Sequence, residues 1–275
     1  MRYEMKETIL RIENVSLELD NRLILREVQA EIKNIRRPDC VQGQVVGFLG
    51  PSGIGKTQLS KIISGLQPPT RGDVVIGPHG ERVHKGRVGM VAQNYLLFEW
   101  ATVLDNFLIA GRQAKLTAPE ARDKAHGFIQ EFKLGEYLEL YPAQLSGGTR
   151  QRVAIVQQLM CSEHLLIMDE PFSGLDMIMK RKACELITEV ADRDELNTII
   201  VVTHDVIEAA SIADTLWLMG YESNGDGSCL PGARLVEQYD LAALDLCWHP
   251  DITKVPRFQE FVGEVKRRFE TLKTF

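Results

Sequence analysis

The segment Gly50–Gln58 sets narrow limits on the fold, because its glycines follow directly on an apolar run. Gly50, Gly55, Lys56 and Thr57 occupy the fixed positions of the pattern GxxxxGK[ST]. Glycines permit a tight turn, since no Cβ obstructs the backbone, and successive N–H groups can then converge on one point. This order predicts a buried strand, a turn, and a helix that begins near Lys56.

Such a turn is suited to phosphate groups. The unpaired N–H groups and the positive dipole end of the following helix attract phosphate oxygens. The ammonium of Lys56 would reach the β- and γ-phosphates, and the Thr57 hydroxyl would ligate Mg²⁺. We therefore expect a nucleoside triphosphate to bind here. The residues expected to contact it are Gly50, Pro51, Ser52, Gly53, Ile54, Gly55, Lys56, Thr57 and Gln58.

Composition and charge narrow the class of protein further. The chain has 275 residues, of which 44% are hydrophobic, enough for a substantial core. A formal charge of −6 gives no electrostatic reason to expect a nucleic-acid partner. Five dispersed cysteines without a CxxC pair favour free thiols in a reducing compartment. No apolar run has the length of a signal-peptide core or a membrane span, so we expect a cytoplasmic protein.

Strand patterns alternate with helical spacing along most of the chain. Residues 9–32 alternate between apolar and polar side chains, which predicts antiparallel strands around a turn at Asp20 and Asn21. Residues 33–40 are polar and contain a proline, and we interpret them as an inserted, exposed loop. Residues 102–140 have amphipathic helical spacing. Further strands are expected at 73–77, 87–92, 164–168, 197–203 and 233–238, and further helices at 176–194 and in the last stretch of the chain.

This alternation predicts an α/β protein with the P-loop NTPase (RecA-like) fold. A parallel sheet would form its core, with an antiparallel β part at the N-terminus and an inserted α-helical subdomain. Ligands of such sheets bind at the carboxyl ends of the strands. Gln93, Asp169 with Glu170, and His204 each follow a predicted strand, as the phosphate loop does. We expect these residues to gather at one edge of the sheet.

Two carboxylates and a histidine fit the chemistry of γ-phosphate hydrolysis. The reaction needs a fixed Mg²⁺, an aligned water molecule and donors for the developing charge. Asp169, at the end of an apolar strand, suits the metal together with Thr57. Glu170 suits the task of orienting or deprotonating the attacking water. His204 ends a buried strand and precedes an acidic residue, which favours a γ-phosphate sensor.

Six segments, in order, resemble the motifs of the ATP-binding cassette (ABC) family of ATPases. The most specific is Leu145–Thr149, which matches the family signature LSGGQ at four positions and has Thr149 in place of glutamine. The others are the phosphate loop, the Q-loop glutamine Gln93, the Walker B segment 165–170, the D-loop 173–176 and the switch histidine His204. The resemblance covers nearly the whole chain and implies an active ATPase that uses ATP and Mg²⁺.

The resemblance also implies a domain plan and further roles. Residues 1–275 would form a single nucleotide-binding domain. Its parts would be an ATP-binding core at 1–93 and 161–240, a helical subdomain with the signature at 94–160, and a C-terminal helical extension at 241–275. Gln93 would ligate Mg²⁺ and assist catalysis beside Glu170 and His204, while Asp176 belongs to the D-loop.

The partners that the resemblance implies begin with a second copy, or a homologous cassette, in a head-to-tail dimer. Each ATP would lie between the phosphate loop of one subunit and the signature of the other. Ser146, Gly147 and Gly148 would open a helix whose N-terminus receives a γ-phosphate from outside its own chain. Separate integral membrane subunits would dock near the Q-loop at the cytoplasmic face of the membrane, and an importer would add a solute-binding protein.

Some positions depart from the family pattern. Leu19 stands where an aromatic residue normally stacks on adenine, Tyr3 lies too early to replace it, and Gln58 stands where threonine or serine is usual. Trp100 and the run Thr102–Asn106 are similar to the nitrate, sulfonate and taurine importer cassettes, which favours import of a small solute. A cassette of an exporter or lipid transporter and a soluble, non-transport ATPase stay open as alternatives. The signature and the D-loop argue against a plain phosphate-loop kinase or GTPase.

Overall fold

A six-stranded sheet forms the centre of the protein in the computed structural model, which describes residues 3–36, 42–162, 164–222, 224, 228–249 and 251–272. The strand order is β10-β9-β3-β8-β7-β6, and every pair except the antiparallel β10 and β9 is parallel. The parallel α/β fold predicted from the sequence is therefore confirmed. The strands are β3 (Gln44–Leu49), β6 (Gly89–Val91), β7 (Leu165–Asp169), β8 (Thr198–Thr203), β9 (Thr215–Gly220) and β10 (Arg234–Asp240).

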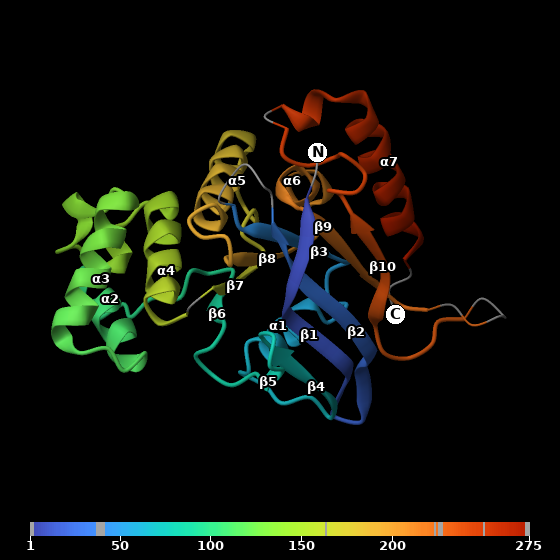
Figure 1. The fold of residues 1–275 in the computed structure, drawn as a ribbon, viewed down its shortest axis with the longest axis horizontal. Coiled ribbons are helices and arrows are strands. Elements are labelled where there is room, and N and C mark those ends of the chain that lie inside the picture. Colours follow the sequence, from blue (N-terminus) through green and yellow to red (C-terminus); the bar gives the residue numbers. More distant parts are fainter. Residues whose placement is uncertain are drawn as a thin grey trace.

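A second sheet, antiparallel and of order β2-β1-β4-β5, covers one face of the first (Figure 1). Its strands are β1 (Glu4–Leu19), β2 (Arg22–Arg36), β4 (Arg71–Ile76) and β5 (Glu81–Arg82). Asp20 and Asn21 have φ of 49° and 58° and form the predicted turn, since a tight hairpin needs positive φ at both positions.

The prediction of a loop over residues 33–40 is wrong for its first half, because β2 continues to Arg36. Ile35 pairs with Met5 of β1 and is buried, as is its neighbour Asn34. Burial and strand pairing of these residues outweigh the polar composition of the segment. The rest of the predicted loop lies outside the described residues.

The parallel strands are buried on both faces. In β8, Ile199 and Val201 pack into a cluster with helices, while Ile200 and Val202 pack into a second cluster with α1 and the antiparallel sheet. Such strands appear in the sequence as continuous apolar runs, which is typical of a parallel sheet between two layers. Helix α1 comprises Lys56–Ile63.

Three helices form a cluster at one side of the sheet, at the left in Figure 1. They are α2 (Val103–Gln113), α3 (Ala118–Glu131) and α4 (Gly147–Cys161), with short 3₁₀ turns η1 (Gly135–Tyr137) and η2 (Pro142–Gln144) before α4. Thr102 caps α2 and Thr117 forms a capping box with Glu120 at α3, so both helices begin at strong local signals.

The remaining helices cover the other face of the parallel sheet. They are α5 (Met177–Ala191), α6 (Val206–Ile212), η3 (Ile252–Lys254) and α7 (Pro256–Thr271). Helix α7 docks its apolar face on the protein itself and buries Phe258, Phe261 and Val265. The sequence patterns did not predict α6 or β9. The helices within the described ranges are all too short or too polar to cross a bilayer.

Candidate functional site

Residues 50–55 join β3 to α1, whose first turn contains Lys56, Thr57 and Gln58, as the sequence predicts. Gly53 and Gly55 have φ of 78° and 104°, a left-handed conformation that side chains with a Cβ adopt at a cost. Gly55 is the N-cap of α1, and no described side chain bonds to the first turn of this helix. The backbone N–H groups at this helix end are therefore available to a ligand.

Lys56 extends beneath this loop. Its Nζ donates to the carbonyl oxygens of Gly50 at 2.7 Å and Pro51 at 3.1 Å, and it lies 3.7 Å from Glu170 Oε1. The side chain is only 6% exposed, and burial lowers the pKa of Lys56 while the Glu170 and Asp169 carboxylates act in the opposite direction. A cation is thus held between the loop and a carboxylate at the end of β7.

Thr57 and Asp169 are joined directly. Thr57 Oγ1 donates to Asp169 Oδ2 at 2.9 Å. Burial raises the pKa of Asp169, the hydrogen bond from Thr57 offsets part of this, and the Glu170 charge adds to it. Asp169 Oδ1 is buried and has no hydrogen-bond partner in the described part of the chain.

This pair fits Mg²⁺, which prefers hydroxyl, carboxylate and water oxygens and retains several waters when phosphates supply the other ligands. The open acceptor on Asp169 is the kind of group that a metal-bound water would satisfy. Across the described residues no three His, Cys, Asp or Glu side chains form a dedicated metal cage.

Glu170 and His204 meet where β7 and β8 end. Glu170 Oε2 lies 2.9 Å from His204 Nδ1 and accepts a hydrogen bond from Thr203 Oγ1 at 3.2 Å. The backbone of Glu170 has a φ of 51°, and its N–H donates to Val202 O at 2.7 Å. Left-handed backbone at a residue with a side chain is strained and is often found at functional sites.

Gln93 follows β6 and joins a different part of the site. Its Nε2 donates to Ser173 Oγ, in the D-loop, at 3.0 Å. Asp176 accepts a hydrogen bond from Met179 N at 2.9 Å and thereby caps α5. Direct contacts thus connect the phosphate loop to both carboxylates and His204, while Gln93 is connected to the D-loop.

The signature residues begin α4. Ser146 is the N-cap, and its Oγ accepts from Thr149 N at 3.3 Å and lies 2.8 Å from Thr149 Oγ1. Ser146 and Gly147 are exposed, whereas Thr149 is buried. Arg150, in the same first turn, donates to Tyr95 O at 3.3 Å and pairs with Glu99, both beyond Gln93.

The sequence analysis missed two side chains that hold the site together. Thr203 donates a hydrogen bond to Glu170, and Ser173 accepts one from Gln93. Thr203 directly precedes His204, and this position was the available signal. Tyr3 does not replace the aromatic residue that normally stacks on adenine. The Tyr3 hydroxyl donates to Asp240, and its ring contacts Trp248 edge-on with the ring centroids 6.1 Å apart. Gln58 Oε1 is buried and lacks a hydrogen-bond partner within the described ranges.

Comparison with known proteins gives consistent matches. A family model described as "ABC transporter" matches residues 36–173. The sulfate/thiosulfate import ATP-binding protein CysA of Escherichia coli K12 is 35% identical over 243 residues, which are 86% of this chain and 62% of that protein. An uncharacterized ABC transporter ATP-binding protein of Bacillus subtilis, YtlC, is 37% identical over 180 residues, with 66% and 69% covered.

The chain spans about 60% of the length of the sulfate/thiosulfate relative from Mesorhizobium japonicum. Among solved structures, cbiO1 from Clostridium perfringens, described as part of the ABC transporter complex cbiONQ, has a TM-score of 0.71 at 21% identity. That match covers 96% of this chain and 97% of cbiO1. At this identity the likeness supports the fold alone.

Proposed function

This chain belongs to the ABC transporter family, and we propose on that premise that it binds and hydrolyses ATP to drive solute transport across a membrane. The observation that carries the proposal is the contact network among Lys56, Thr57, Asp169, Glu170 and His204. It brings an ammonium, a hydroxyl, two carboxylates and an imidazole to one edge of the sheet, the groups to which we assign phosphate binding, metal binding and water activation. Each group has a separate task in hydrolysis.

In this proposal the loop N–H groups and Lys56 bind the β- and γ-phosphates, and Thr57 and Asp169 hold Mg²⁺. Bound there, Mg²⁺ would neutralise charge on the phosphate oxygens. The Glu170 carboxylate orients the attacking water and accepts its proton. His204 positions that carboxylate through Nδ1 and presents the rest of its ring to the γ-phosphate. Gln93 contributes to the metal site when it leaves Ser173.

The site is completed by a second copy of the chain in a head-to-tail dimer. Ser146, Gly147 and Gly148 contribute the N-terminus of α4 to the ATP bound by the other subunit. This geometry uses an exposed helix end that carries no acidic group in its first turn, which suits an anionic ligand. ATP favours the closed dimer because the nucleotide contacts both subunits there.

We further propose that the transport is import of a small solute, with an anion as the first candidate. The names of the CysA relatives, which describe sulfate/thiosulfate import, support this direction. Separate membrane subunits would bind beside the Q-loop, where Leu96 and Trp100 are 69% and 74% exposed. The chain would then lie on the cytoplasmic face of the membrane, and an import system would add a solute-binding protein.

A pull-down of the tagged chain from its native cells in mild detergent tests the proposal. We expect a stoichiometric multi-span membrane protein, with less recovered for Trp100→Ala than for Leu66→Ala, a matched change at a leucine that is 50% exposed. A co-purifying solute-binding protein would support import. Recovery of ribosomal or other soluble partners alone would contradict a transport role, and a membrane complex without any solute receptor would favour export.

A further inference from the structure

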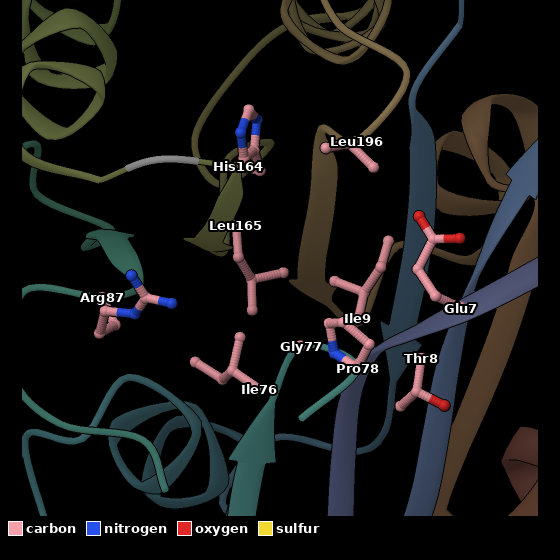
Figure 2. Close-up of a pocket in the computed structure, with 10 residues that line it drawn as sticks. All are labelled: Glu7, Thr8, Ile9, Ile76, Gly77, Pro78, Arg87, His164, Leu165 and Leu196. Carbon is pink, nitrogen blue, oxygen red and sulfur yellow. The ribbon is translucent and has the colours of Figure 1, made fainter. Parts of the chain in front are cut away.

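The two ends of β7 and β8 have different surroundings. At their amino ends an apolar cavity of about 470 Å³ lies between the two sheets, and Leu165 and Leu196 are among the residues that line it (Figure 2). At their carboxyl ends polar groups contact one another directly. Thr203 Oγ1 donates to Glu170 Oε2 at 3.2 Å and accepts from Asp205 N at 3.1 Å. Residues 203–205 thus form one hydrogen-bonded segment that contacts the Glu170 carboxylate.

Asp205 departs from the local rule for its position. It is the N-cap of α6, where an aspartate side chain normally accepts from backbone N–H groups of the first turn. Within the described residues no side chain makes such a bond at this helix end. The Asp205 carboxylate pairs instead with Lys180 Nζ of α5. Departures from local rules are expected where a residue serves function.

Lys180 joins two carboxylates of the switch region. Besides Asp205, its Nζ lies 3.6 Å from Glu208 Oε1, in the first turn of α6. The hydrogen bond to Asp205 raises the pKa of Lys180, while burial and the neighbouring Asp205 raise the pKa of Glu208. Without the ammonium, two partly buried carboxylates would repel each other. The Asp205 side chain would then turn towards water or towards the uncapped N–H groups of α6.

We infer that Lys180 is a positioning residue for ATP hydrolysis: it holds the Asp205 carboxylate away from the end of α6 and thereby fixes residues 203–205 against Glu170. Asp205 directly follows His204 and its N–H is bound to Thr203, so a displaced Asp205 would move both groups that contact Glu170 Oε2. A shift of about 1 Å in a positioned group can lower turnover ~10²-fold. The inference rests on the proposed role of Glu170.

Lys180→Met tests the inference, because methionine is similarly long and has no charge. In steady-state hydrolysis kcat should fall about tenfold, while KM for ATP should stay within about twofold, since the phosphate loop is unchanged. The melting temperature should change little, because the freed Asp205 can cap α6 in exchange for the lost ion pair. Lys182→Met, at an exposed lysine of the same helix, is the matched control and should behave as wild type.

Two further variants separate positioning from a structural role. Lys180→Arg retains the charge and should recover kcat to within about threefold of wild type. Asp205→Asn weakens the same pair and keeps a side chain that can cap α6. Combined with Lys180→Met, it should lower kcat no further than one change alone does, because both changes remove one contact.

The outcomes distinguish this inference from the proposed function. Wild-type kcat in folded Lys180→Met, or additive losses in the double variant, would overturn the role of Lys180 alone. If Lys180→Met does not fold, Asp205→Asn decides, and wild-type kcat in that variant would overturn the inference in the same way. Absence of hydrolysis in both wild type and Lys182→Met would instead contradict the proposed function.

Discussion

The N-termini of α1 and α4 differ in what surrounds them, although we propose that both bind phosphate. At α1 the glycine loop has Lys56 beneath it and Asp169 beside it, and described side chains leave the helix end uncapped. At α4 Ser146 caps its own helix through Thr149, and the glycine that follows is exposed. The first end has a cation and a carboxylate of its own, whereas the second offers mainly backbone donors.

This difference is what a site shared between two chains requires. A complete phosphate site on one chain would need no second copy, while the end of α4 cannot neutralise a triphosphate without charges supplied from elsewhere. Changes at the α1 side should therefore affect chemistry within one subunit. Changes at the α4 side should affect only steps that need two subunits.

The largest effect is expected for Glu170→Gln. The amide retains the shape of the carboxylate and can accept from Thr203, but it cannot take a proton from water. Turnover should fall by ~10²–10⁴-fold, while ATP binding persists and dimers accumulate. Steady-state phosphate release and size-exclusion chromatography with ATP measure both. Hydrolysis near the wild-type rate by a monomer would remove Glu170 from the mechanism.

Ser146→Arg tests the exposed helix end. A bulky side chain there should block closure on a second subunit and lower hydrolysis at least ~10-fold, since overpacked contacts destabilise an interface. ATP binding to the monomer should stay within about twofold, because the change leaves the phosphate loop intact. Thr117→Arg, which alters the N-cap of α3 in the same cluster, is the matched control. Equal loss in both variants would mean that cap removal explains the effect.

Mixing two inactive chains distinguishes a shared site most directly. Lys56→Ala disables the α1 side and Ser146→Arg disables the α4 side, so a head-to-tail heterodimer retains one site with both sides intact. Random pairing should restore about a quarter of wild-type hydrolysis, because half of the dimers are mixed and each has one working site of two. A single chain with both changes, mixed with wild type, has no such site in the heterodimer, so only the quarter of dimers that are wild-type homodimers should hydrolyse ATP. No activity in the first mixture, or half of wild-type hydrolysis in the second, would contradict head-to-tail pairing, because each chain would then have its own site.

Much of the α1 side could be predicted, because its groups follow local rules. A glycine pattern after an apolar strand predicts the loop, and strand ends predict that Asp169 and His204 approach it. The contacts of Thr203 and Ser173 could not be predicted, since they depend on which strands are neighbours. The order β3-β8-β7 places β8 between the strands that lead to Lys56 and Glu170. No local pattern specifies that order.

The prediction of the fold is limited in the same way, because some strands depend on pairing between distant segments. β9 was not identified because Thr215–Gly220 is a short apolar run, and such runs do not distinguish a buried strand from part of a helix. The end of β2 was misread because Asn34 and Arg36 look like loop residues. Their neighbour Ile35 is nevertheless buried against β1. Long-range pairing decided both cases, whereas strong local caps such as Thr117 made the helical cluster predictable.

The smallest effect concerns the nucleotide-free protein. Because the pKa of Asp169 is raised on folding, the folded chain holds this proton more tightly than the unfolded chain does, and the charged form costs stability. Asp169→Asn removes that cost and should raise the melting temperature near neutral pH by about 2 °C. The gain should disappear as the pH falls from the raised pKa towards about 4, the ordinary value for aspartate.

With ATP and Mg²⁺ the wild type should have the higher melting temperature, because it gains stability from a ligand that the Asp169→Asn variant binds poorly. Thermal melts across pH, with and without the nucleotide, measure both parts, and Asp20→Asn at the exposed hairpin turn is the control. If Asp169→Asn melts lower than wild type without nucleotide, the carboxylate stabilises the fold through Thr57 and Lys56. The α1 side would then owe its arrangement to internal pairing, and the contrast with α4 would lose its link to phosphate binding.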